Sequence, residues 1–378
     1  MRKLIVVCGL GLLFLGFGSV AQEPIKIGMN EPLTGPFASI GIDMVRGAQL
    51  AVDEINRAGG ILGRPLKLIV EDNKGEVEAA IAAAERLAYV HKVDVIVGPT
   101  YTFLVRAIHE IYKEARIPHL VTATHPTLTK LGNPYLFRLR APDDVVTKAM
   151  VVFAVEELGA KRIAIAYQTD DWGIGAKDEI IRNLKNLYGL DPVATVGAAM
   201  DLRDYTGVWM ELAKAHPDVV LTYIHGGIPA GLYLKTRWEL GLTDIQVIGS
   251  TAIAELVTIE MAGVEASEGV MVTGYHFMDE IKVRLLEQWY YEKYGEHSQS
   301  PCPFHMYDAV HLVAEAIRKA GVIERQAIRD ALIGLQMEGV LWTYKVRENG
   351  ETTFVVKIGV VKNGSPKLLK AVDLASKE

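Results

Sequence analysis

The sequence predicts an α/β protein built from two Rossmann-like, doubly wound lobes. Three observations indicate this fold class: short apolar strands alternate with amphipathic helices, the alternation runs through two successive cycles, and no low-complexity linker separates the cycles. Alternating strands and helices produce parallel sheets covered by helical crossovers. Because no tether joins the two cycles, we expect the lobes to meet at a hinge made of short, strand-like crossings.

The first cycle opens with an apolar strand at 25–29. Val45, Ala48 and Val52 then recur at the spacing of one helix face, and the pattern stops at Gly59. Further strands are expected at 66–70, 93–97 and 119–121, and further helices at 77–89 and 103–114.

The second cycle begins near Asp143 and repeats the same order. Its expected strands lie at 162–167, 193–196, 218–224, 246–248 and 269–273, and its helices at 145–158, 174–187, 205–215, 230–240 and 252–261. Three more helices are expected at 281–294, 304–319 and 325–333. Near the end of the chain, alternating stretches at 342–346 and 353–361 flank the turn Glu348-Asn349-Gly350 and predict a β-hairpin.

The first 21 residues have the order of a secretory signal peptide. A basic pair, Arg2 and Lys3, precedes an apolar run that ends at Phe17, and the small residues Ser19 and Ala21 mark a cleavage site. The run is shorter than the roughly 20 apolar residues of a membrane anchor. We therefore expect export to the periplasm, cleavage after Ala21 and no membrane insertion of the mature chain.

Composition narrows the possible classes of protein. Cleavage would remove Cys8 and leave about 357 residues with Cys302 alone, so no internal disulfide is expected and the length suits two domains. The formal charge of −6, with both signs interspersed, offers no basic surface for a phosphate backbone. Nucleic acid is therefore not an expected partner.

Motifs for catalysis or metal binding are incomplete. His109 starts like a zinc-protease helix, but the position of the second histidine holds Lys113. Cys302 and His305 supply too few ligands for zinc. The glycine pattern of a dinucleotide loop is broken at Asp178. We predict no catalytic residues, no metal and no cofactor.

Several blocks of the sequence resemble one known family. They are Ile25-Lys26-Ile27-Gly28, Glu31-Pro32-Leu33-Thr34-Gly35-Pro36, Gly47-Ala48-Gln49-Leu50-Ala51-Val52-Asp53-Glu54-Ile55-Asn56, Ala58-Gly59-Gly60-Ile61-Leu62-Gly63-Arg64, Ile96-Val97-Gly98-Pro99, Pro217-Asp218-Val219-Val220, Glu268-Gly269-Val270 and Tyr307-Asp308-Ala309-Val310. Together they resemble the leucine/isoleucine/valine-binding protein family along nearly all of the chain after the leader.

This resemblance implies a type I periplasmic binding fold, whose chain crosses between the lobes three times and whose lobes close on a ligand by a hinge. The first lobe would hold 22–141 plus 275–357, and the second 142–274 plus 358–378. Ligands of open α/β sheets sit beyond the carboxyl ends of the strands. We therefore expect the loops after Val97, Val121, Tyr167, Tyr223 and Ile248 to line the cleft.

A ligand carboxylate is expected at the loop after the strand 93–97. Thr100-Tyr101-Thr102 follows that strand and opens a helix, where unpaired backbone N–H groups and the helix dipole favour an anion. By the resemblance, the family's carboxylate-binding serine falls on Thr102 and its second hydroxyl on Thr124, while Thr122 and Ala123 offer backbone contacts. Without the resemblance, Thr102 and Thr124 are better explained as helix caps.

The opposite end of the expected site departs from the family. The family's acidic residue, which takes the ligand's ammonium, corresponds here to Thr251. The accompanying aromatic hydroxyl aligns with Tyr223 or His225. The negative charge could instead come from a neighbouring loop, through Asp170, Asp171 or Glu255. If none of these supplies it, the ligand needs no amine.

Contacts to the body of the ligand are expected from the entrance loops. Ile40 and Trp172 fall where the family places residues against the ligand's side chain, although Trp172 could instead pack near the hinge. Tyr101 and Phe304 are expected to add apolar surface. A cleft of this kind suits an aliphatic or aromatic body.

The resemblance implies a solute receptor that delivers branched-chain amino acids, or a related small carboxylate, to the membrane permease of an ABC importer. A second hypothesis keeps the fold and changes the ligand to an aromatic acid, a keto acid or a small amide, because Thr251 replaces the acid. A third, a secreted Rossmann-like enzyme, is disfavoured by the incomplete motifs. A ligand sensor of the same fold would need a signalling segment that the sequence does not show.

Export gives the first testable prediction. The protein purified from the cell envelope should begin at Gln22 and carry no lipid, because Cys8 lies inside the apolar part of the leader. Intact-mass spectrometry measures this directly. A retained leader or a diacylglyceryl adduct would contradict the prediction.

Overall fold

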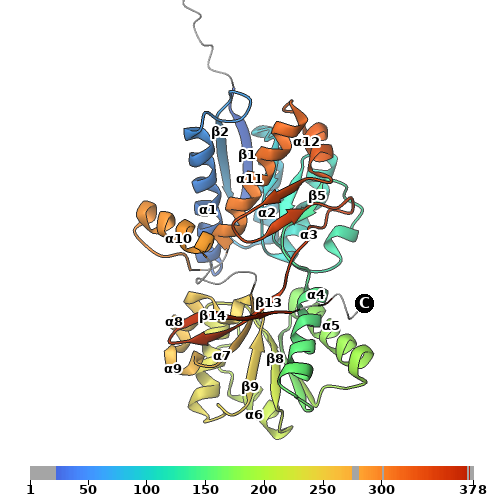
Figure 1. Ribbon diagram of the computed structural model, residues 1–378, viewed down its shortest axis with the longest axis vertical. Helices are drawn as coiled ribbons and strands as arrows, with labels where there is room; N and C mark the ends of the chain where they lie inside the picture. Colours follow the sequence, from blue (N-terminus) through green and yellow to red (C-terminus); the bar gives the residue numbers. More distant parts are fainter. Residues whose placement is uncertain (1–22, 275–280, 300–301, 373, 375–378) are drawn as a thin grey trace, which may run out of the picture.

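The structure is a computed structural model that describes residues 23–274, 281–299, 302–372 and 374 (Figure 1). It consists of two lobes, each with a central sheet covered by helices, and the predicted fold class is confirmed. The expected leader lies outside the described residues. The expected lobe boundaries at 141/142, 274/275 and 357/358 stay a prediction, and the second of them adjoins the undescribed residues 275–280.

The first lobe contains, within the described residues, a parallel five-stranded sheet in the order β2-β1-β3-β4-β5. Its strands are β1 (Ile25–Glu31), β2 (Leu66–Asp72), β3 (Val95–Val97), β4 (His119–Val121) and β5 (Leu136–Arg138). The surrounding elements are α1 (Ala38–Arg57), α2 (Val77–Glu85), α3 (Thr102–Glu114), α10 (Ile281–Tyr294), α11 (Cys302–Ala320), α12 (Arg325–Leu332) and the small ribbon of β11 (Gln336–Glu338) and β12 (Thr343–Lys345). Helices cover both faces of such a sheet, so Ile25, Ile27 and Met29 of β1 are fully buried.

The second lobe contains, in the part of the chain described, a seven-stranded sheet in the order β14-β13-β10-β9-β8-β6-β7. Its strands are β6 (Ile163–Gln168), β7 (Ala194–Ala198), β8 (Val219–Tyr223), β9 (Gln246–Gly249), β10 (Met271–Gly274), β13 (Lys357–Lys362) and β14 (Ser365–Ala371). Its helices are α4 (Asp143–Val152), α5 (Asp171–Tyr188), α6 (Thr206–Lys214), α7 (Ile228–Glu239), α8 (Leu256–Ala262) and α9 (Val264–Ser267). The strands from β6 to β10 are parallel, so their carboxyl ends share one edge of the sheet.

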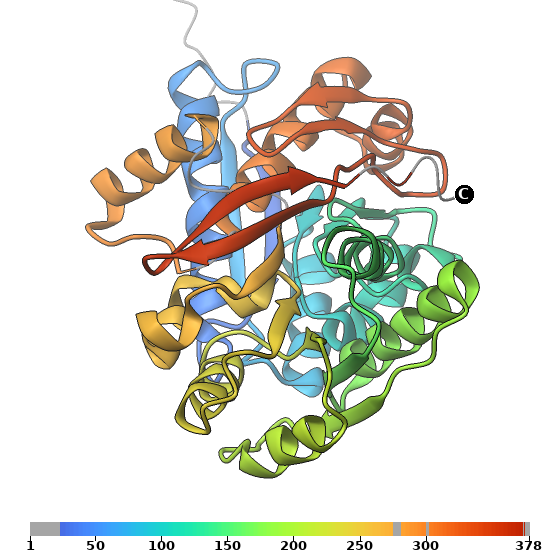
Figure 2. The same cartoon turned by 60° about the horizontal axis from the view of Figure 1, so that its bottom comes forward.

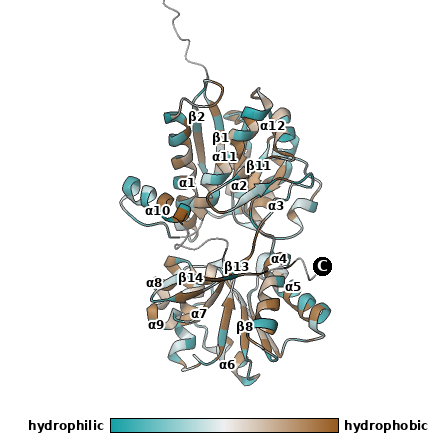
Figure 3. Cartoon of the chain, in the orientation of Figure 1, coloured by the Kyte–Doolittle hydropathy of each residue, from teal (hydrophilic) through white to brown (hydrophobic). Residues whose placement is uncertain are grey.

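Hydrophobic residues concentrate on the strands and on the inner faces of the helices, whereas the outer helix faces are hydrophilic (Figure 3). In the first lobe α1 packs against α11 at short range. A Cβ atom on Gly47 would lie 2.1 Å from the carbonyl oxygen of Pro303, so only glycine allows this approach. No helix in the described ranges is both long and apolar enough to span a membrane.

Two of the elements expected from the sequence, a hairpin and a helix, differ from the structure. The predicted hairpin of 342–346 with 353–361 forms only around its turn, by a bridge between Val346 and Thr352. Beyond the turn the chain leaves the first lobe, and β13 pairs antiparallel with β10 and β14 of the second (Figure 2). The predicted helix 252–261 is also wrong, because a 3-10 turn (Thr251–Ala254) and α8 are separated by Glu255 in extended conformation.

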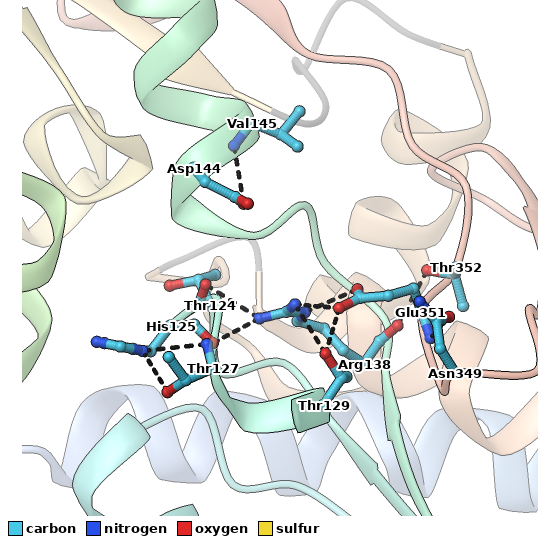
Figure 4. A network of polar contacts seen from close by, with 10 residues as sticks. All are labelled: Thr124, His125, Thr127, Thr129, Arg138, Asp144, Val145, Asn349, Glu351 and Thr352. Carbon is cyan, nitrogen blue, oxygen red and sulfur yellow. Dashed lines mark hydrogen bonds and ion pairs between the residues drawn. The ribbon is translucent and has the colours of Figure 1, made fainter. Parts of the chain in front are cut away.

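A buried guanidinium joins the chain segments between the lobes (Figure 4). Arg138, at the end of β5 and 1% exposed, pairs with Glu351 through two nitrogens, one of them Nε at 3.0 Å from Oε2. Its Nη1 donates to the carbonyl oxygens of Thr124 at 3.2 Å and His125 at 2.7 Å, and its Nη2 reaches Thr129 Oγ1 at 3.5 Å. Five contacts therefore use the five N–H donors of the guanidinium.

Backbone contacts reinforce this junction. The amide of Arg138 donates to Gly350 O at 2.8 Å, and Thr352 Oγ1 donates to Arg138 O at 3.0 Å. The end of β5, the loop that carries Thr124 and the segment that leads into β13 are thus held together. All three segments adjoin the space between the lobes.

Removal of the carboxylate from this junction should destabilise the protein strongly. Glu351→Ala leaves a buried guanidinium without its counter-charge, which we expect to cost about 3–5 kcal/mol of unfolding free energy. Urea unfolding followed by tryptophan fluorescence measures the change. The matched control is Glu157→Ala, which removes the exposed partner of Lys370 and should cost less than about 1 kcal/mol. Equal losses in the two variants would contradict the prediction.

Candidate functional site

A cavity of about 540 Å³ lies between the two lobes. Residues from all five loops expected at the cleft line it, at the carboxyl ends of β3, β4, β6, β8 and β9. The segment before α1 and the loop between β7 and α6 contribute further walls. The volume falls in the range of small-molecule sites.

The expected anion end is formed by the first lobe. Thr100, Tyr101 and Thr102 line the cavity, and α3 begins at Thr102. Tyr101, rather than Thr102, occupies the cap position, and among the described residues the Thr102 hydroxyl has no hydrogen-bond partner. The hydroxyl therefore remains available to a ligand, together with the backbone N–H groups of the first turn.

Thr124 also lines the cavity, but its hydroxyl is engaged within the protein. It accepts a hydrogen bond from Trp172 Nε1 at 3.2 Å and interacts with the carboxylate of Asp143. Thr122 and Ala123 are buried beside it and do not line the cavity. Contact of these residues with a ligand stays a prediction.

The expected polar end is formed by the second lobe, where Tyr223, His225 and Thr251 line the cavity. The hydroxyl of Thr251 is already engaged within the protein, since Oγ1 donates a hydrogen bond to Thr273 O at 2.9 Å. Asp170 does not line the cavity. It caps α5 by accepting from the amide of Gly173 at 2.9 Å and lies 2.8 Å from His225 Nε2, so it orients the imidazole instead.

The apolar wall contains three of the four side chains expected there. Ile40, Tyr101 and Trp172 line the cavity. Phe304 does not, because α11 begins two residues earlier than predicted and buries the ring in a cluster with Leu50, Val283, Leu286, Tyr290 and Leu341. Cys302, at the start of α11, lines the cavity in its place.

Aromatic rings from both lobes meet at the cavity. Phe37 and Tyr101 of the first lobe have ring centroids 4.5 Å apart. In the second lobe Trp172 stacks on His225 at 4.6 Å and lies 4.9 Å from Tyr223. Tyr101 and His225 approach to 6.4 Å across the lobes. Phe37 was missed from the sequence because it precedes the apolar pattern of α1.

Glu255 is one of three acidic residues that line the cavity in the described part of the chain, with Asp143 and Asp201. It stands alone in extended conformation between the 3-10 turn and α8, which turns its carboxylate into the cavity and against Gly226. A Cβ atom on Gly226 would lie 1.8 Å from Glu255 Oε2, so glycine is needed there. In the part of the chain described, no hydrogen bond or ion pair reaches this carboxylate. Burial raises its pKa to about 8; Asp43 also raises the pKa, whereas the charge of Arg140 lowers it.

Arg140 and Asp143 add an opposite pair of charges to the cavity wall. Burial raises the pKa of Asp143 to about 6, although hydrogen bonds with Thr124 and Tyr223 and the charge of Arg140 lower it. The Tyr223 hydroxyl donates to Asp143 Oδ1 at 3.1 Å. Neither residue was expected at the site, because no recognisable motif surrounds the start of α4.

The two lobes also touch directly at the start of α5. Arg106 of α3 lies 2.8 Å from Asp171, and Trp172 bonds to Thr124 as described above. A Cβ atom on Gly175 would lie 2.8 Å from the ring of His125. These contacts place the lobes in a closed arrangement around the cavity.

Metal binding receives no support from side-chain geometry. Across the described ranges, no group of three or more histidine, cysteine, aspartate or glutamate side chains is arranged to hold a metal ion. The charge of Arg140 lowers the pKa of both Glu255 and Asp143. The cavity is therefore lined by hydroxyl groups, carboxylates, the guanidinium groups of Arg140 and Arg203, and aromatic rings.

Comparison with known proteins gives one consistent family. A family model described as periplasmic binding protein matches residues 24–365. The chain is 28% identical over 321 residues to the leucine-, isoleucine-, valine-, threonine- and alanine-binding protein of Pseudomonas aeruginosa, with 83% of each chain covered. It is also 28% identical over 260 residues to the Leu/Ile/Val-binding protein BraC3 of Rhizobium johnstonii, covering 68% of this chain and 70% of that protein.

Solved structures share the architecture. The branched-chain amino acid transporter substrate-binding protein LivJ of Streptococcus pneumoniae, in complex with isoleucine, superposes with a TM-score of 0.84 at 26% identity, covering 93% of this chain and 99% of that one. A solute-binding protein from R. palustris, in complex with benzoate, gives a TM-score of 0.81 at 18% identity, covering 92% of this chain and 96% of that one. At 18% identity the likeness concerns the fold alone.

Proposed function

The chain belongs to the periplasmic binding protein family, and on this premise we propose that it is the solute receptor of an ABC importer and closes two lobes over an α-amino acid. The single observation that supports the amino acid is the distribution of polar groups in the cavity. Free donors lie in the first lobe at the start of α3, and an unpartnered carboxylate, Glu255, lies in the second. A zwitterion complements both.

The carboxylate of the ligand would bind at the start of α3. Thr102 supplies a free hydroxyl, and the first backbone N–H groups of the helix supply further donors. Thr124 would act differently from the expectation drawn from the sequence. Because its hydroxyl already links Trp172 to Asp143, it would hold the wall in place, while Thr122 and Ala123 are buried beside it.

The ammonium of the ligand would bind at Glu255, which takes over from the acid missing at Thr251. A carboxylate without a partner in a desolvated cavity is unfavourable, and a cation removes that penalty. Tyr223 and His225 would flank the ligand, and Asp170 would keep His225 oriented. Ile40, Tyr101 and Trp172 would contact its side chain.

Closure would make the receptor recognisable to the permease. A ligand that contacts both lobes shifts the population towards the closed arrangement by its greater affinity for that arrangement. The protein would act in the periplasm by binding and release and would catalyse no reaction. The related proteins, all described as binding proteins, support this reading.

A second candidate is an amine-free aromatic acid. The rings of Phe37, Tyr101 and Trp172 favour it, since they provide a flat apolar surface beside the anion site. Such a ligand would leave Glu255 without a counter-charge. The two candidates therefore predict opposite effects of pH.

Loss of the free hydroxyl should weaken binding of either ligand class. Thr102→Val preserves the β-branched shape and removes one donor to a carboxylate, which contributes about 1.5–3 kcal/mol, so affinity should fall about 10- to 150-fold. Calorimetry measures the affinity, and the melting temperature without ligand should barely change. Thr206→Val is the matched control at the start of α6, where the side chain does not line the cavity. Wild-type affinity in Thr102→Val would remove the carboxylate assignment.

The pH dependence of binding tests the ammonium assignment. Glu255 is protonated below its pKa of about 8 and must lose that proton to pair with an ammonium. Affinity for an amino acid should therefore rise by about tenfold per pH unit from pH 6 to about 8 and then level off. In Glu255→Gln the affinity should be lower and the slope should disappear. Affinity that instead falls with rising pH would identify an amine-free acid as the ligand.

A further inference from the structure

The wall of the cavity formed by the second lobe contains a second acceptor besides Glu255. Gln168, at the end of β6, lines the cavity and is completely buried. Its Nε2 donates to Ala198 O at 2.9 Å and to Ala199 O at 2.7 Å. These two carbonyl groups fix the amide, because the opposite orientation would place oxygen against oxygen.

The other end of this amide is unsatisfied. Within the described residues, Gln168 Oε1 has no hydrogen-bond partner. Ser250, which follows β9, is 7% exposed, lines the cavity and likewise has a hydroxyl without a partner there. Buried polar atoms are normally paired, so both positions call for polar groups of a ligand.

The strand order separates these positions. β9 and β6 both neighbour β8 and lie on opposite sides of it. Ser250 and Glu255 follow β9, whereas Gln168 ends β6. Neighbouring strands are about 4.8 Å apart, which puts β9 and β6 roughly 10 Å from each other. A single ammonium reaches acceptors at about 3 Å and cannot serve both ends.

We propose that Gln168 forms a second polar subsite, and that the ligand is an α-amino acid whose side chain carries a hydrogen-bond donor, such as a carboxamide or a hydroxyl. This inference rests on the proposed function, since it takes Glu255 as the site of the ammonium. The donor of the side chain meets Gln168 Oε1. Trp172, beside the same end of β6, provides the flat surface against which that side chain packs.

The subsite predicts selection between amino acids of equal shape. The side chains of asparagine and leucine have the same branching and similar size. The side chains of glutamine and methionine have similar length. A site with a buried acceptor rejects the member of each pair that leaves the acceptor unpaired. We expect asparagine to bind about tenfold more tightly than leucine, and glutamine about tenfold more tightly than methionine.

The experiment is calorimetric titration of the full-length mature protein with these four amino acids and with benzoate. In Gln168→Met the preference for asparagine over leucine should vanish. This variant also loses the hydrogen bonds to the backbone of residues 198–199, so a control is needed. Thr169→Val removes a hydroxyl that donates to the same Ala198 carbonyl at 3.3 Å, and Thr169 does not line the cavity. The control variant should keep the preference for asparagine.

The outcomes separate the two proposals. Leucine binding as tightly as asparagine to the wild-type protein would overturn the polar subsite and leave the amino-acid receptor intact. A preference that survives in Gln168→Met would overturn the assignment to Gln168. Binding of benzoate but of no amino acid would overturn the amino-acid ligand and the subsite together.

Discussion

The contacts of one buried guanidinium hold the walls of the cavity in place. Arg138 ends the last strand of the first sheet, and its five donors meet Glu351, Thr129 and two backbone carbonyl groups. Those carbonyl groups belong to the loop whose Thr124 side chain bonds to Trp172 of the second lobe. Since a buried cation must be paired, the three segments cannot separate from it without a large penalty. The loop is therefore rigid where the lobes meet.

The parallel sheets explain why donors and acceptors lie on opposite sides of the cavity. In the first lobe α3 begins at the cavity, which the unpaired N–H groups of its first turn adjoin and Thr102 lines. In the second lobe α5 is capped by Asp170, and the first positions of α7 contain Pro229, which has no N–H. Helix starts thus offer donors mainly on one side. The second lobe instead contributes the acceptors Glu255 and Gln168 to the cavity wall.

Periodicity alone was enough to predict the fold class, because buried parallel strands and amphipathic helices have different repeats. It also pointed to Thr102, which follows a strand and opens a helix. It could not choose Glu255 over Asp170 and Asp171 as the acidic group of the site. The segment 252–261 has the composition of one continuous helix, and the break appears only when Thr251 bonds to the next strand and the chain turns at Glu255. Phe304 was misplaced for a similar reason, since α11 starts at Cys302 and rotates that ring into the core.

Desolvation of Glu255 couples closure of the lobes to the chemistry of the ligand. The carboxylate belongs to the second lobe, and Tyr101 of the first lobe is close enough for the charge of Glu255 to raise the pKa of its phenol, after the larger effect of burial. Closure thus removes water from around the carboxylate, which favours its protonated form. An ammonium inside the cavity reverses that preference, because it supplies the missing counter-charge. For the proposed amino-acid ligand, the closed arrangement would consequently be more stable with a cationic group at this position than with an apolar one, and selectivity would follow from burial of the acid rather than from the shape of the cavity alone.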